Sequence, residues 1–206
     1  MENEIVSKLN WVDLVIFFVI LRIVYISHKR GLAIELFKLA GLLFAIFLSF
    51  HYYPKVADMV HPVSMAVANF FDSVSLVVLF IFILVLFKFI RDAVFLMVKI
   101  HPVEGIDRWG GFFIGIFRSI VICSVILVVM QISVFTYLQD SAKEAFSNKY
   151  LGRIAPMVYA KIFDVAVSKY SPEEKINLLL FQAVGSKTLQ QQKQEAVPQR
   201  EVPPQL

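Results

Sequence analysis

The sequence has little charge, a single cysteine and none of the short motifs that mark common enzyme classes. Charged residues make up 17% of its 206 residues, against about 25% in soluble domains. The one cysteine, Cys123, excludes an internal disulfide, and we expect it to be a small buried apolar side chain. A glycine-rich phosphate loop, paired Cys/His metal ligands and a nucleophile elbow are missing. We therefore expect no enzyme activity, no catalytic or metal-binding residue and no cofactor.

What the chain does contain is apolar sequence, gathered in four blocks. Hydrophobic residues make up 58% of the chain, and the blocks occupy residues 11–26, 32–53, 73–100 and 109–137. About 20 apolar residues are needed to cross a bilayer as a helix. The pattern predicts an all-α membrane protein with four transmembrane helices and the lipid bilayer as its partner. The net charge of +4 favours an anionic lipid surface over nucleic acid.

The blocks divide the chain into three parts. We expect a four-span domain over residues 9–139, a region of amphipathic helices over 140–185, and a disordered tail rich in Gln and Pro over 186–206. Ser171-Pro172-Glu173-Glu174 is a capping box that predicts the start of the last amphipathic helix. Residues 55–72 predict a loop with a short amphipathic helix.

Small residues recur every fourth position in two of the blocks. Gly111, Gly115 and Ser119 lie on one face of the fourth block, where they let another backbone approach closely. We expect the second span to occupy that face. Asp107 is a predicted N-cap, so the fourth helix should begin near Arg108. The second block carries a similar stripe, formed by Gly41, Ala45 and Ser49.

Four ionisable residues lie inside the blocks and on the same side of the membrane. From the ~1.5 Å rise per helical residue, Arg22, Glu35, Lys38 and Arg118 lie roughly 6 to 13 Å from the ends of their spans, near the first and third loops. A charge at such depth costs about 2.5–3.5 kcal/mol and should be paired. We predict that Glu35 and Arg118 are partners, with Arg22 or Lys38 adjoining.

This charge cluster has two interpretations. Intramembrane ionisable groups commonly line an ion or substrate path. Alternatively, Arg22 and Lys38 extend to the nearby interface while Glu35 and Arg118 form a structural ion pair. His28, His51, His61 and His101 are scattered over loops and span ends, where we expect interfacial positions and not ligands.

The distribution of basic residues predicts the orientation. Six lysines and arginines flank the spans in the first and third loops, against four on the other side. The excess places these two loops in the cytoplasm and both termini outside.

Three motifs, in order along the chain, carry a resemblance to a known family. They are Asn10-Trp11-Val12-Asp13, then Lys29-Arg30-Gly31-Leu32 followed by Gly41, then Gly105-Ile106-Asp107-Arg108 followed by Gly111, Gly115 and Arg118. With these motifs the chain resembles the colicin V production protein (CvpA) family from about Asn10 to Pro156. Ser119 stands where the family usually has glycine, and it keeps the position small.

The resemblance implies a multi-pass protein of the bacterial inner membrane, accessory to toxin production or export and to envelope processes. Another membrane or envelope protein is then a candidate partner. The charge cluster keeps a second class open, a small transporter or channel. A flux assay in liposomes separates the two, and a stable co-purifying protein favours the accessory role.

Overall fold

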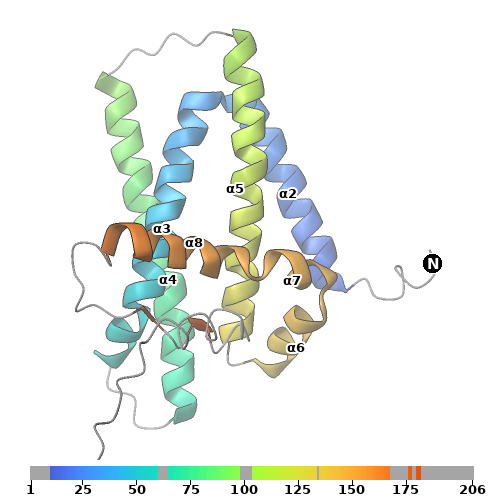
Figure 1. Ribbon diagram of the computed structural model, residues 1–206, viewed down its shortest axis with the longest axis vertical. Helices are drawn as coiled ribbons and strands as arrows, with labels where there is room; N and C mark the ends of the chain where they lie inside the picture. The colour runs from blue at the N-terminus through green and yellow to red at the C-terminus, as the bar shows by residue number, and fades with distance from the viewer. Residues whose placement is uncertain are drawn as a thin grey trace, which may run out of the picture.

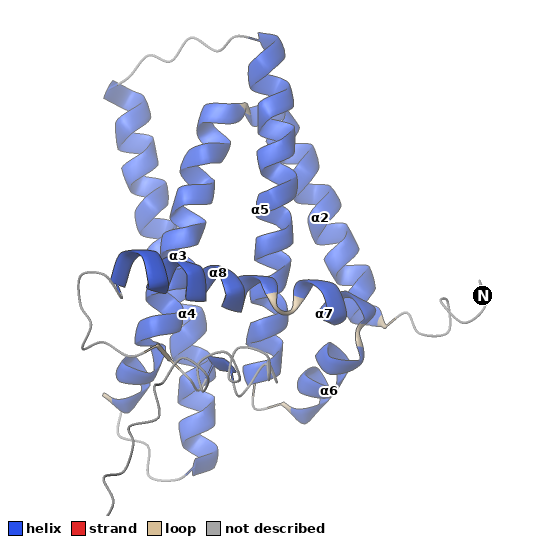
Figure 2. Cartoon of the chain, viewed as in Figure 1, coloured by secondary structure: helices blue, strands red, loops and turns tan. Residues whose placement is uncertain are grey.

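The described part of the chain is built from helices, and four of them are long and apolar enough to cross a membrane. The computed structural model describes residues 10–59, 65–97, 104–133, 135–167, 176–177 and 180–181. The candidate spans are α2 (Trp11–Arg30), α3 (Leu32–Asp58), α4 (Met65–Met97) and α5 (Glu104–Ile132). No strand occurs in these ranges (Figure 2). The all-α, four-span class predicted from the sequence is confirmed.

Helix α5 is the centre of the bundle. It packs against both α2 and α3, while α4 packs mainly against the far side of α3. The row is therefore α4, α3, α5, α2. Helices α2 and α3 are joined by a tight turn at Gly31, yet they diverge from that turn and share few contacts (Figure 1). Helix α5 packs against both arms and holds them together.

The second span is longer than the sequence predicted. Tyr52, Tyr53 and Pro54 were expected to end it, but α3 continues through Pro54 to Asp58. Proline lacks the N–H that would bond the carbonyl of Phe50, four residues earlier. The side-chain amide of Asn177 donates to that carbonyl at 2.8 Å, so the helix passes through the proline without an unsatisfied acceptor.

The third and fourth spans also differ in their limits. α4 begins at Met65, so the predicted start near Ser73 is wrong and the helix takes up much of the predicted loop over 55–72. α5 begins at Glu104 and ends at Ile132, earlier at both ends than the sequence indicated. Phe135 is the N-cap residue of the next helix, which begins at Thr136.

Short helices from the C-terminal part lie across one side of the bundle, as Figure 1 shows. They are α6 (Thr136–Glu144), α7 (Phe146–Leu151), α8 (Ile154–Ile162) and the π-helical turn η1 (Phe163–Val167). Helices were predicted in this region, although α6 begins before the expected boundary at Asp140. The capping box at 171–174 and the tail over 186–206 lie outside the described residues. Ile176, predicted to be helical, is not.

Two different surfaces result from this packing. The interior contains Phe50, Leu76, Val128 and Tyr159, all almost fully buried. The outward faces of α2 and α4 expose large apolar side chains, among them Phe18 at 60% and Phe82 at 62%. Such a continuous apolar exterior on long helices is what lipid contact requires.

Candidate functional site: a buried ion-pair cluster

Glu35 is the centre of the polar cluster near the turn between α2 and α3. Its side chain is fully buried, at 0% exposure. It lies four residues beyond Gly31, roughly 6 Å along α3. A carboxylate removed from water requires an opposite charge and hydrogen-bond donors.

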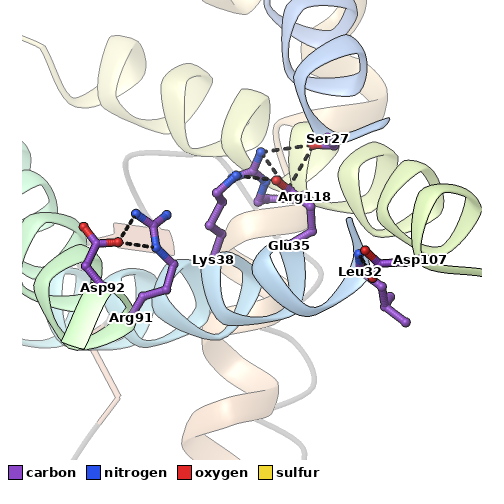
Figure 3. A network of polar contacts seen from close by, with 8 residues as sticks. All are labelled: Ser27, Leu32, Glu35, Lys38, Arg91, Asp92, Asp107 and Arg118. Atoms are coloured by element: carbon purple, nitrogen blue, oxygen red, sulfur yellow. Dashed lines mark hydrogen bonds and ion pairs between the residues drawn. The ribbon is translucent and has the colours of Figure 1, made fainter. Parts of the chain in front are cut away.

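Three side chains supply those donors. Arg118 Nη2 lies 2.9 Å from Glu35 Oε2, and the hydroxyl of Ser27 donates to the same oxygen at 2.9 Å. Lys38 Nζ contacts the other oxygen, Oε1. Arg118 also donates to Ser27 Oγ at 3.2 Å, which closes the network drawn in Figure 3. The predicted contact between Glu35 and Arg118, with Lys38 adjoining, is confirmed.

Arg22 does not join this network. It is exposed on α2 and makes none of these contacts. Five helical residues separate it from Ser27, which turns its side chain about 140° around the helix from the face that meets α5. Arg22 therefore belongs to the outer surface of the bundle.

Glycines on α5 allow the close approach that assembles the cluster. A Cβ added to Gly111 would lie 2.9 Å from the Ser27 carbonyl oxygen and from the Gly31 carbonyl carbon. A Cβ added to Gly115 would overlap the side chain of Ser27. The small-residue face therefore receives the last turn of α2, and not the second span as predicted. The adjoining face of α5, which carries Arg118, is left for α3.

Asp107 serves a helix other than its own. It was predicted to cap the start of α5, but α5 begins three residues earlier. Its carboxylate instead accepts the backbone N–H of Leu32 at 2.7 Å, at the start of α3. Gly31 makes this possible with a φ of +86°, and a side chain there would overlap the Asp107 carboxylate. The contact fixes the turn that places Ser27 and Glu35 together.

The remaining motif residues lie around this scaffold. Gly41 packs beneath Phe87 of α4, where an added Cβ would come within 2.9 Å of the Phe87 Cβ. Gly105 lies in the first turn of α5, and Arg108 is exposed one residue after Asp107.

Asp13 organises the opposite end of the bundle. It is 6% exposed, and its carboxylate accepts the backbone N–H groups of Asn10 at 3.1 Å, Phe146 at 3.1 Å and Ser147 at 2.7 Å. It also accepts the Ser147 hydroxyl. Asp13 thus caps its own helix and α7 at once. The sequence indicated only a residue at the edge of a span.

A hydrogen-bond network near the same end was missed by sequence reasoning. His51 is 7% exposed, and its Nδ1 lies 3.1 Å from the hydroxyl of Tyr159. That hydroxyl accepts the backbone N–H of Asn177 at 3.2 Å. Pro54 signals one contact beside this network, because a proline inside a helix leaves a carbonyl, here that of Phe50, which needs another donor and receives it from Asn177.

A cavity of about 130 Å³ lies beside the ion-pair cluster, between α3, α4 and α5. Four cationic side chains line it, namely Lys38, Lys88, Arg91 and Arg118. The rest of its wall is apolar, formed by Phe37, Gly41, Leu42, Leu84, Phe87 and Ile122. Arg91 is paired with Asp92, with Nη2 and Oδ1 2.6 Å apart. Within the described ranges, no group of three His, Cys, Asp or Glu side chains is placed to hold a metal ion.

The arrangement binds helices together through charge and can attract an anion to the cavity. The network around Glu35 joins the first, second and fourth spans at one level of the membrane. Its carboxylate is shared by two cations, so positive charge remains on the cavity side.

Comparison with known proteins supplies one match. The family model described as "Colicin V production protein" matches residues 12–156. This range begins one residue into α2, includes the other three candidate spans and reaches the start of α8. No curated protein and no solved structure matches the chain.

Proposed function

Because the chain belongs to the colicin V production protein family, we propose that this multi-pass membrane protein is accessory to the production or export of a colicin V type toxin and to processes of the cell envelope. The observation that carries the proposal is the closed network around Glu35. Its buried charges join helices to one another. The same junction is supported by four motif residues, namely Gly31, Asp107, Gly111 and Gly115. This arrangement supports a role as a membrane scaffold.

We further propose that the protein resides in the bacterial inner membrane with the α2–α3 turn in the cytoplasm. The six-to-four excess of basic residues on that side supports this orientation. Reporter fusions at Lys29 and after Gly185 should lie on opposite sides of the membrane. A cytoplasmic signal from the fusion after Gly185 would overturn the orientation.

The accessory role is tested by toxin secretion. A producing strain without this protein should release less active toxin, and the intact gene should restore the release. Glu35→Gln should restore little because it disrupts the junction, whereas the exposed Asp92→Asn should restore it fully. Equal toxin release with and without the protein would refute the role. A protein that co-purifies from solubilised membranes with the intact chain and not with Glu35→Gln would identify the partner.

A second candidate function is a small transporter or channel, favoured by the cation-lined cavity between α3, α4 and α5. Purified protein in liposomes should then accelerate anion flux, and Lys88→Gln should reduce the acceleration. If the flux is the same with and without the protein, the transporter function is refuted and the accessory role remains. No enzymatic step is proposed for that role, because the sequence carries no catalytic motif.

A further inference from the structure

The charge around the cavity is unbalanced. Four cationic side chains line it, and two carboxylates contact them, Glu35 and Asp92. Lys88 has no acidic partner in the described part of the chain. Two positive charges are therefore left over in a region of low polarity, where a bound anion is the ordinary means of compensation.

The cavity has room and donors for such an anion. A single water needs roughly 10–15 Å³ of such space, so about 130 Å³ admits a group of several heavy atoms. Among the described residues, Arg118 Nε is a buried N–H without a hydrogen-bond partner. Arg91 and Lys38 come from facing helices and project to the same side of α3 (Figure 3). Guanidinium and ammonium donors from two helices suit the several oxygens of a phosphate group.

The position of the cavity indicates where the anion comes from. Lys38 lies seven residues beyond Gly31, roughly 10 Å into the span. Lys88 is exposed on α4, and its neighbours Leu86, Phe89 and Ile90 are exposed apolar side chains of the lipid-facing surface. The entrance is thus bordered by lipid, and the inner wall is largely apolar. A soluble anion would interact only with the cationic side chains. The headgroup of a phospholipid would interact with these cations, while its glycerol and acyl chains would contact the apolar surface.

We propose that this cavity is a binding site for an anionic phospholipid, whose phosphate group lies among Lys38, Lys88, Arg91 and Arg118. Basic pockets between transmembrane helices are a recurring way of holding such headgroups. The phosphate oxygens accept hydrogen bonds from Arg118 and Arg91, and Lys88 closes the entrance. The lipid offsets the excess positive charge and joins α4 to the α3–α5 pair.

The test measures lipid retained by the full chain. Protein purified in detergent is titrated with phosphatidylglycerol or phosphatidylcholine, and bound lipid is counted by native mass spectrometry. We expect the intact protein to prefer phosphatidylglycerol, and Lys88→Gln with Arg91→Gln to weaken that binding at least tenfold. Lys88→Gln alone leaves every ion pair intact and should weaken it several-fold, which keeps the test valid if the double variant folds poorly.

The matched control removes the same charge outside the cavity. Arg22→Gln with Lys29→Gln also deletes two cations, both exposed on α2, and should leave phosphatidylglycerol binding within twofold. Equal loss in the two pairs would show non-specific attraction and overturn the site. Inorganic phosphate at millimolar concentration should not displace the lipid. Displacement by inorganic phosphate would overturn the lipid assignment and show that a soluble anion occupies the cavity.

Discussion

The two ends of the bundle hold their helices together through different kinds of polar contact. Near the α2–α3 turn, helices are held by charge, with buried Glu35 between two cations. Near the C-terminal helices they are held by capping and neutral hydrogen bonds, from Asp13 to the start of α7 and from Asn177 to the α3 backbone. Among the described residues, the additional helices α6, α7 and α8 pack near the second end (Figure 1).

The number of unpaired backbone N–H groups at each end explains why one end uses ion pairs and the other uses caps and hydrogen bonds. The short helices α6 to α8 bring many unpaired N–H groups to one end, and a single carboxylate or hydroxyl can satisfy several of them. Ser124, for example, accepts the N–H of Ala155 at 2.7 Å. The turn end has fewer helix starts, those of α3 and α5. Asp107 accepts the N–H of Leu32 at the start of α3, and Ser27, Glu35, Lys38 and Arg118 pair with one another.

The largest expected effect comes from breaking the charged end. Glu35→Gln should lower the free energy of unfolding by about 3–5 kcal/mol, because two buried cations lose their carboxylate. Adding Arg118→Gln should cost less than the sum of the two single changes. The measurement is a denaturant titration in mixed micelles.

The control for this cycle is Asp92→Asn. Its carboxylate is 50% exposed, so the loss of its pair with Arg91 should cost about 1 kcal/mol or less. Strict additivity of the Glu35 and Arg118 changes would contradict the coupling.

A smaller effect should follow from filling the contact between α5 and α2. Gly111→Ala places a methyl group 2.9 Å from backbone atoms of Ser27 and Gly31, which cannot move aside, and should cost about 1–3 kcal/mol. Gly110→Ala is the matched control, because its methyl would meet the flexible end of Leu32. Equal unfolding free energies for the two variants would show that the α2–α5 contact is loose.

Hydropathy and the helical rise per residue were enough to predict the four spans and the contact between Glu35 and Arg118. A long apolar run can only be a buried or membrane helix, and a buried carboxylate must find a cation. Glu35 was the acid at the right depth for Arg118, so helical rise alone brought the two together.

Contacts that depend on tertiary juxtaposition were not predictable in this way. Asp107 looks like the cap of its own helix and Asp13 like a residue at the edge of a span, yet their carboxylates accept N–H groups at the starts of α3 and α7. Asn177 and Phe50 are 127 residues apart. Nothing in the sequence around either residue specifies such a partner. In the same way, the spacing of small residues on α5 does not indicate which helix packs against them.

The end of the bundle near α7 can be tested at Asp13. Asp13→Ala removes the acceptor for three backbone N–H groups and should cost about 2 kcal/mol, since caps contribute up to that amount. Amide hydrogen exchange should rise first in α7. Asp140→Ala removes an exposed carboxylate of α6 and should leave both measurements unchanged. Unaltered exchange in α7 on Asp13→Ala would refute the capping role.

The smallest expected effect concerns the amide of Asn177, which also contacts the Tyr53 hydroxyl, so a second background is needed to separate its hydrogen bond to Phe50. Asn177→Ala leaves the Phe50 carbonyl without its donor and should cost about 1 kcal/mol. In a Pro54→Ala background, residue 54 regains an N–H that can bond this carbonyl within α3, so the same Asn177→Ala change should cost less. Asn148→Ala removes the acceptor of the Gln131 amide elsewhere in this end of the bundle, and its cost should be the same in both backgrounds. If the cost of Asn177→Ala is also independent of residue 54, then Asn177 acts through other contacts and the passage of α3 through Pro54 has a different cause.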